Sequence, residues 1–481
     1  MCQRVWDLRH KERDMRSWHA LLAATLTGCA NIETTKPPAI ELPQTTAQAP
    51  ANLDRFWTLF DDAQLSALVD EAQRANLDLR LAMARIDEAR AAAQLARSGY
   101  FPSVDAYFGA SRNRTSNDTA RQFPGPLITT TYTGGLSAAY EVDLWGKVRN
   151  GSRAAAANLL AARYSTETVR VALAAQVAST YFSLRALDAE LDVTRATLTG
   201  REENVALQRQ RFDAGLANDL DLKLAEAERA AVAAVAPAIE RARAQTEAAL
   251  AQLLGRSAKH VFTPAVARGA TIDAALAAPE VPAGLPSDML ARRPDVRQAE
   301  AQLVAADARI AEARTAYFPS LTLTARYGGE SSDLADLFSS PARVWSIAGN
   351  LLQPLVALNR IGAQVDAAQA RREQAAVLYQ QTVQSAFRDA HDALVAHRAA
   401  REIYTAQDER RAKLGDALKL ADLRYKNGYS SFLEVLDAQR NLLDAERARV
   451  NALRDRQTAL VDLYKALGGG WEVGSALSVQ R

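Results

Sequence analysis

Ser98-Gly99-Tyr100-Phe101-Pro102-Ser103 returns about 217 residues later as Thr315-Ala316-Tyr317-Phe318-Pro319-Ser320. The similarity begins upstream, where Asp78-Leu79-Arg80 matches Asp295-Val296-Arg297. It resumes downstream, where the matched segments are Arg211-Phe212-Asp213-Ala214-Gly215 and Arg424-Tyr425-Lys426-Asn427-Gly428. Two halves of roughly 210 residues therefore share one plan, and a period of this length indicates an internal duplication rather than a solenoid.

After each copy of the opening stretch, apolar and polar side chains alternate along the chain. The alternating sets are Val104, Ala106 and Phe108 with Ser103, Asp105 and Tyr107 in the first half, and Leu321, Leu323 and Ala325 with Thr322, Thr324 and Arg326 in the second. A period of two with one apolar and one polar face is typical of a barrel wall. We expect the partner strands at about 132–144 and 343–355, beyond loops rich in Asn, Ser, Asp, Gly and Pro.

Each half also predicts three helices. The expected ranges are 62–99, 148–214 and 218–254 in the first half, and 294–316, 361–427 and 431–467 in the second. Between Val169 and Leu198, apolar side chains recur at mostly alternating steps of four and three, which is close to a heptad repeat. The long helix would measure on the order of 100 Å. Such a rod must pack along other rods.

These elements predict the fold class, which is mainly α with a β-barrel. After the N-terminus no window reaches about 18 uninterrupted apolar residues, so a membrane-spanning part would have to be a closed β-barrel. Four strands per chain cannot close a barrel in lipid, but three chains would supply about twelve. The sequence therefore predicts a homotrimer with a twelve-stranded transmembrane β-barrel and an α-helical barrel of long helices.

The start of the chain has the pattern of a bacterial lipoprotein leader. Leu26-Thr27-Gly28-Cys29 follows the short apolar run 20–26 and resembles a lipobox, which makes Cys29 the expected lipid attachment site. Met1 to Asp14 is highly charged, so Met15 is the alternative true start and Cys2 would then not be made. The remaining chain has no cysteine, which excludes a disulfide framework.

The sequence thus divides into a signal peptide (1–28), a lipidated extended segment (29–60), a first repeat (61–255), a linker (256–290), a second repeat (291–468) and a tail (469–481). A net charge of +2 gives no electrostatic sign of a nucleic-acid partner. His391 and His397 are six residues apart and share a helix face poorly, so no metal site is expected. We find no phosphate-cradling glycine loop or nucleophile elbow, and predict no cofactor and no enzyme activity.

Three motifs resemble the TolC-type outer-membrane efflux factor family, in its lipoprotein branch. They are Phe56-Trp57 with Asn76-Leu77-Asp78-Leu79, the mid-chain run Leu285-Pro286-Ser287-Asp288-Met289-Leu290-Ala291-Arg292-Arg293-Pro294-Asp295-Val296, and Tyr425-Lys426-Asn427-Gly428 with Phe432-Leu433-Glu434-Val435-Leu436-Asp437-Ala438-Gln439-Arg440. The resemblance covers nearly the whole mature chain. It implies a trimeric exit duct, anchored by lipid in the outer membrane and crossing the periplasm, that works with a periplasmic adaptor and an inner-membrane pump.

The resemblance also implies a gate at the second helix turn, formed by Tyr425, Leu433, Glu434 and Asp437. Independently of it, Glu434 and Asp437 lie three residues apart and share one helix face, so three-fold repetition would bring like carboxylates together. The turns and their expected adaptor contacts involve Gly215, Asp219, Asp221, Gly428 and Ser430. Asn218 and Asp219 are alternatively helix caps. Some family members carry an arginine at the position of Ser430, so their salt bridge is not expected here.

The leading interpretation is an efflux duct for drugs, toxic compounds or metals. Its nearest alternative is the same fold serving an ABC-driven type I protein secretion system. A trimeric coiled-coil stalk or adhesin has no need of strands at mid-chain, and a peptidoglycan-cleaving enzyme needs a catalytic cluster that the sequence does not contain. The transported substrate and the energy source do not follow from the sequence.

Overall fold

The structure, a computed structural model, describes residues 55–116, 127–263, 265–269, 271–273 and 293–469. The expected leader with Cys29, most of the linker and the C-terminal tail lie outside these residues. The chain divides into two compact units, and each is described by itself. One unit contains residues 93–156 and 303–376, and the other contains residues 157–302 and 377–481 together with a segment from 39 to 92.

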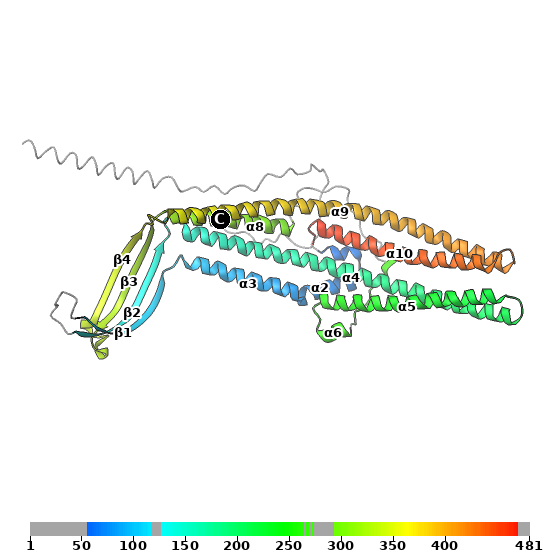
Figure 1. Cartoon of the computed structure of the whole chain (residues 1–481), viewed down its shortest axis with the longest axis horizontal. Helices are drawn as coiled ribbons and strands as arrows, with labels where there is room; N and C mark the ends of the chain where they lie inside the picture. Colours follow the sequence, from blue (N-terminus) through cyan, green and yellow to red (C-terminus); the bar gives the residue numbers. More distant parts are fainter. Residues whose placement is uncertain (1–54, 117–126, 264, 270, 274–292, 470–481) are drawn as a thin grey trace, which may run out of the picture. The chain divides into compact units, whose positions relative to one another are not determined.

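The first unit contains a four-stranded antiparallel sheet in the order β1-β2-β3-β4 (Figure 1). Its strands are β1 (Ser103–Arg114), β2 (Ile128–Val142), β3 (Ser320–Ser331) and β4 (Arg343–Leu352). The central pair, β2 with β3, joins the two halves of the duplication, with Tyr132 opposite Ser331 and Val142 opposite Leu321. The sequence correctly predicted the four strands. In the described chain, β1 and β4 each pair on one side only.

The register sorts the side chains of this sheet onto two different faces. Because directly paired residues point to the same side, one row consists of Val104, Ala138, Ala325 and Ile347, and the next of Ala106, Leu136, Tyr327 and Trp345. We call this side the apolar face. The opposite side, the polar face, carries rows such as Asp105, Ser137, Arg326 and Ser346. The predicted alternation is confirmed.

The long helices also lie close to their predicted positions. They are α3 (Leu77–Ser98), α4 (Lys147–Asp213), α5 (Asp219–Leu253), α8 (Pro294–Arg314), α9 (Leu358–Lys426) and α10 (Phe432–Ala466). The 67 residues of α4 and the 69 of α9 each correspond to about 100 Å of helix. Shorter pieces are η1 (Phe56–Phe60), α2 (Ala63–Ala75), α6 (Ala258–Phe262), η3 (Thr315–Tyr317), η4 (Leu334–Asp336) and η5 (Ser340–Ala342). Among the described residues, no helix has the length and apolar character needed to cross a membrane.

The prediction of one helix over 62–99 was wrong, because the chain breaks between α2 and α3 at Asn76. Asn76 has an extended ψ of 135°. Its Oδ1 accepts hydrogen bonds from the backbone N–H groups of Asp78 (2.8 Å) and Leu79 (3.0 Å), which caps the start of α3. Its Nδ2 donates to the carbonyl of Leu253 at the end of α5 (2.9 Å). Asn76 thus connects the start of α3 to the end of α5.

The second half repeats this tie with a different residue. The Arg293 guanidinium, at the start of α8, donates a 3.1 Å hydrogen bond to the carbonyl of Ala466 at the end of α10. It also pairs with Asp295 at 2.7 Å. Since Ala466 and Leu253 are equivalent in the two halves, the duplication extends to how each returning helix is held, by an amide in one half and by a guanidinium in the other.

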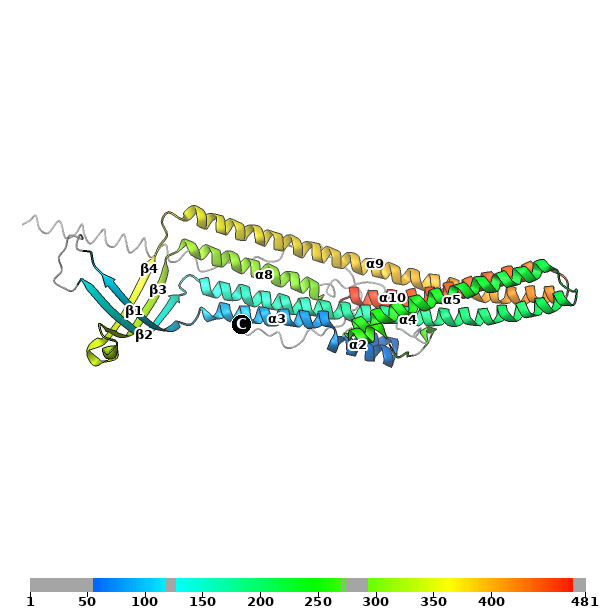
Figure 2. The same ribbon diagram turned by 60° about the horizontal axis from the view of Figure 1, so that its bottom comes forward.

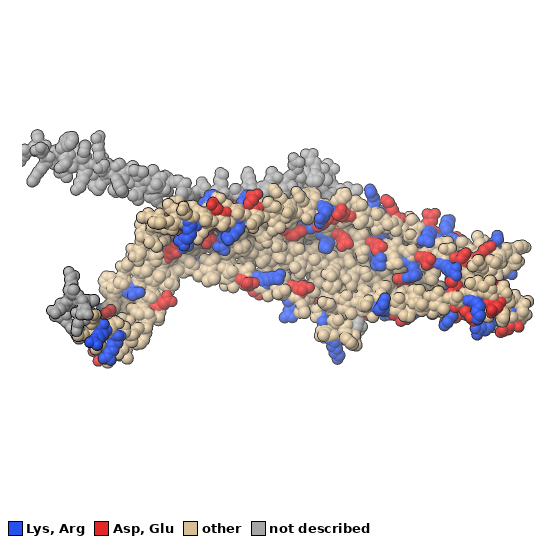
Figure 3. All heavy atoms as spheres, in the orientation of Figure 1, with Lys and Arg blue, Asp and Glu red and all other residues tan. Residues whose placement is uncertain are grey.

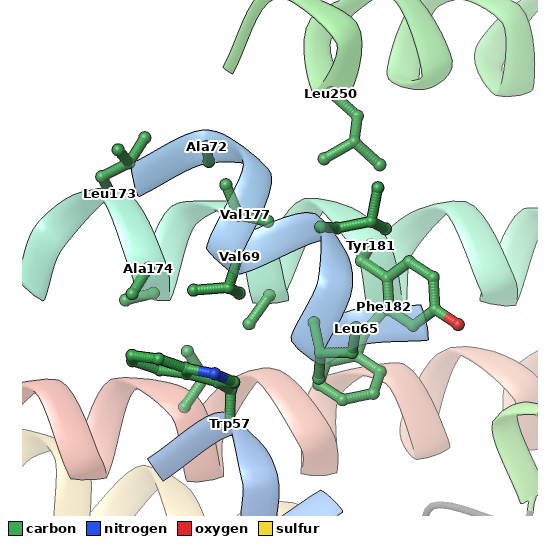
Figure 4. Packing of buried hydrophobic residues seen from close by; sticks show 14 of the residues in the cluster. Trp57, Leu65, Val69, Ala72, Leu173, Ala174, Val177, Tyr181, Phe182 and Leu250 are labelled. Atoms are coloured by element: carbon green, nitrogen blue, oxygen red, sulfur yellow. The ribbon is translucent and has the colours of Figure 1, made fainter. Parts of the chain in front are cut away.

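The main core of the second unit packs η1 and α2 against α4, α5 and α10 (Figure 4). Trp57, Leu65, Val69, Tyr181 and Phe182 are among its buried members. The Tyr181 hydroxyl donates a 2.7 Å hydrogen bond to Asp62 Oδ2 and accepts one of 3.1 Å from the backbone of Gly269. A buried hydroxyl therefore joins α4 to the cap of α2 and to the segment that follows α6.

We expect Tyr181→Phe to lower the stability of the folded protein by about 1–2 kcal/mol, because it leaves a buried carboxylate oxygen of Asp62 and the half-buried amide of Gly269 without their partner. Tyr429→Phe, at a residue 78% exposed, is the control. Thermal melting followed by circular dichroism compares the two variants. Equal melting temperatures would contradict a structural role for the Tyr181 hydroxyl.

Candidate gate at the helix turns

The α4–α5 and α9–α10 turns lie at the same end of the second unit (Figure 2) and share one backbone geometry. Gly215 and Gly428 have positive φ angles of 71° and 77°, which glycine adopts without strain. The N–H of Leu216 donates to the carbonyl of Arg211 (2.8 Å), and the N–H of Tyr429 to that of Arg424 (2.9 Å). Each long helix therefore ends in the same left-handed cap.

The two returning helices start differently. Asn218 Oδ1 accepts a 2.8 Å hydrogen bond from the N–H of Asp221, so Asn218 is the cap of α5. Asp219 is the first residue of the helix and is exposed, and Asp221 is half-buried in the same first turn. At the equivalent position of α10, the side chain of Ser431 makes no capping bond. Both acids of α5 favour this helix start, because carboxylates stabilise the positive end of the helix dipole.

The structure places Leu433, Glu434 and Asp437 together on the exposed side of α10. The opposite side buries Phe432, Val435 and Leu436 in a small apolar cluster with residues of α4, α5 and α9. The three predicted gate residues of α10 are thus available to other chains or to solvent, while the side that holds α10 in place is apolar.

Each gate acid has an arginine of the same chain nearby. Glu434 Oε2 lies 3.6 Å from Arg424 Nε, and Asp437 Oδ1 lies 3.4 Å from Arg440 Nη1. Arg440 also donates to Glu228, a buried carboxylate of α5. The hydrogen bond with Glu228 raises the pKa of Arg440 above its usual range. The Arg440 charge is therefore committed largely to Glu228, and Asp437 keeps an exposed carboxylate.

Tyr425, the remaining predicted gate residue, is held by the other half of the chain. Gln208 Nε2 donates a 3.2 Å hydrogen bond to its hydroxyl, and Arg211 Nη1 donates one of 3.1 Å. The Arg211 guanidinium also lies 5.5 Å from the centre of the tyrosine ring, and the ring packs against Phe432 at 5.5 Å. We call Tyr425, Gln208 and Arg211 the Tyr425 clasp. It links α4 to α9.

Sequence reasoning identified Tyr425 but not Gln208, and it treated Arg211 only as part of the repeated motif. Ser430 is half-buried, and within the described chain its Oγ has no hydrogen-bond partner. At the tips of the turns, Leu216 and Tyr429 are 80% and 78% exposed. Apolar side chains therefore stand open on both turns.

A comparison with protein-family models matches the family described as outer membrane efflux protein twice, over residues 68–256 and 285–469. The chain belongs to this family. The two matches coincide with the two halves of the duplication. Membership makes the protein an outer-membrane channel of an efflux pump, and a transport protein rather than an enzyme.

The chain aligns with named relatives over most of their length and of its own. The chain is 37% identical to the solvent efflux pump outer membrane protein SrpC of Pseudomonas putida over 418 residues, which cover 86% of this chain and 87% of SrpC. It is 32% identical to the cation efflux system protein CusC of Escherichia coli over 94% of this chain and 98% of CusC. The open-state structure of Neisseria gonorrhoeae MtrE superposes with a TM-score of 0.81 at 32% identity, covering 92% of this chain and 98% of that one.

Proposed function

We propose that three copies of the chain form a lipid-anchored exit duct in the outer membrane, entered from the periplasm at the turns next to Gly215 and Gly428. The observation that carries this proposal is the sheet of the first unit. It has one apolar and one polar face, and β1 and β4 each have a free edge in the described chain. In lipid a free edge leaves N–H and C=O groups without partners, at a cost of several kcal/mol each.

Pairing β4 of one copy with β1 of the next satisfies both edges, and three copies give a closed ring of about twelve strands. The polar face then lines the passage and the apolar face meets the lipid. The duct has no energy source of its own and conducts passively.

Light scattering of the detergent-solubilised protein tests the assembly. The expected mass is three chains, and the trimer should persist in mild detergent because its strand edges are paired between copies. A monomer that inserts into bilayers in stable form would refute the proposal.

We also propose that Cys29 carries the lipid and that residues 1–28 are removed. The support is the lipobox after a short apolar run, and the physical reason is that an acyl anchor holds the chain start at the membrane surface. Mass spectrometry of the mature N-terminus should give a lipidated Cys29. An unmodified Cys29 preceded by intact residues would contradict this, and Cys29→Ser, with the leader otherwise unchanged, should accumulate as unprocessed precursor.

A passive duct of this kind needs partners that deliver the substrate and supply the energy. A periplasmic adaptor and an inner-membrane pump supply the substrate and the energy, and the open apolar side chains Leu216 and Tyr429 offer the adaptor a contact on each turn. The named relatives export a solvent and a cation, so we propose small solutes as the cargo. No observation favours the protein-secretion alternative.

A further inference from the structure

The three charged residues on the apolar face of the sheet are all arginines. Within the four strands, Asp105, Glu141, Arg326 and Glu330 lie on the polar face, whereas Arg112, Arg114 and Arg343 lie on the apolar one. The three are exposed, and none makes an ion pair with an acid of the described chain. The apolar face therefore carries positive charge without a compensating negative charge.

These arginines gather at one end of the sheet. Arg112 and Arg114 end β1, and Arg343 begins β4, so all three lie toward the end that is remote from the helices that flank the strands. Lys and Arg atoms are visible there in Figure 3. At the other end of β2, Lys147 pairs with Glu141 at 2.9 Å. The two ends thus differ, with a paired charge at one and unpaired cations at the other.

The β3–β4 connection adds an aromatic residue to the remote end. It folds back over the apolar face, where Leu337 packs at Gly134 and Gly329 and is only 1% exposed. A β-carbon on Gly329 would lie 1.8 Å from the Leu337 carbonyl oxygen, so this close approach requires glycine. The next residue, Phe338, is left 81% exposed. An anchored turn thus holds an exposed phenyl ring beside Gly134, in the register row that also contains Gly329 and Arg343.

The apolar face between Ser103 and Arg112 is about as tall as the hydrocarbon part of a membrane. From Ser103 to Arg112 the strand rises about 30 Å, which at a tilt of roughly 40° corresponds to about 23 Å of membrane. The apolar part of a transmembrane barrel is about 25 Å tall. Arg112 therefore falls at the height where lipid headgroups begin.

We infer that Arg112, Arg114, Arg343 and Phe338 form a binding surface for a phosphorylated glycolipid of the outer leaflet. The guanidinium groups hold its phosphates and the phenyl ring packs against its acyl chains. This inference rests on the proposed trimer, in which the β4 edge of one copy meets the β1 edge of the next. That pairing brings Arg343 to the same seam between copies as Arg112 and Arg114.

The test uses purified trimer in detergent, with bisphosphorylated lipid A and its dephosphorylated form as probes, and native mass spectrometry as the readout. Each guanidinium near an anionic headgroup is worth a factor of roughly 5 in affinity, so replacing all three by Gln should weaken binding of the phosphorylated probe by roughly 100-fold. Binding of the dephosphorylated probe should change little. Arg326→Gln removes an arginine from the opposite face and is the matched control.

Phe338→Ser supplies a second variant, and it should weaken binding of both probes. Equal binding of both probes by the wild-type trimer, or undiminished binding by the triple variant, would overturn the inference. Competition by millimolar inorganic phosphate alone to the same extent as by lipid A would also overturn it, because the surface would then be a simple anion site. Light scattering of every sample shows whether the trimer is intact. Loss of the trimer rejects the proposed function. An intact trimer without lipid preference rejects only this binding surface.

Discussion

Asp437→Asn should reduce the cation selectivity of the reconstituted channel by roughly five-fold. In the proposed trimer three such carboxylates would act together on a passing ion, and a net effect of about 1 kcal/mol after screening at physiological salt corresponds to this factor. The substitution removes the charge and keeps the shape. Single-channel reversal potentials in planar bilayers under a salt gradient measure the selectivity. Block by divalent or trivalent metal ions should weaken in parallel.

The duplication provides the control for this prediction. Asp221 is equivalent to Glu434, but Leu224 occupies the position equivalent to Asp437, so the first turn lacks the second acid. Asp221→Asn should therefore alter selectivity less. If Asp437→Asn changes neither selectivity nor metal block while Asp221→Asn abolishes them, the gate belongs to the other half of the chain.

Tyr425→Phe should raise the open probability of the channel by roughly 30-fold. The change removes the hydrogen bonds of the hydroxyl with Gln208 and Arg211, which link α4 to α9. One of these is donated by a charged arginine, and together they contribute about 2 kcal/mol to keeping the two helices together. Bilayer recordings at fixed voltage report the open probability. The effect requires that opening separates α4 from α9.

The equivalent residue of the first half, Phe212, has no hydroxyl and is partly exposed, so Phe212→Leu is a matched change outside the Tyr425 clasp. It should leave the open probability near that of the wild type. Equal effects of the two substitutions would show that the turns respond to any change at these positions rather than to loss of the Tyr425 hydroxyl. An unchanged open probability in Tyr425→Phe would remove the clasp from the gating mechanism.

Regular periodicity explains which parts of the fold were predictable. Alternation from Ser103 to Phe108 indicated a two-faced strand, and the register confirms it, because a period of two admits only one assignment of faces. The long helices followed from heptad spacing in the same way. The break at Asn76 did not, because an asparagine within a helical pattern is compatible with a helix interior as well as with a cap, and its bond to the distant carbonyl of Leu253 has no local signal.

The candidate site was likewise predictable only where spacing along one helix decides which residues lie together. Glu434 and Asp437 could be placed on one helix face from their spacing alone. The Tyr425 clasp depends on which residues of α4 lie beside α9, and Gln208 is 217 positions away from Tyr425 in the sequence. No local pattern encodes that lateral register. The same holds for Glu228, whose buried carboxylate accepts a hydrogen bond from Arg440, the arginine nearest to Asp437.

The most direct measurement of the central claim, a trimeric duct whose entrance is ringed by Asp437, is block by Cd²⁺ of the channel carrying Asp437→Cys. Three thiolates brought together at the axis form a soft-metal site, so micromolar Cd²⁺ should close the conductance of this variant, and a chelator should restore it. Leu224→Cys, at the equivalent position of the first half, should remain conducting. Block of Leu224→Cys with no block of Asp437→Cys would contradict the account.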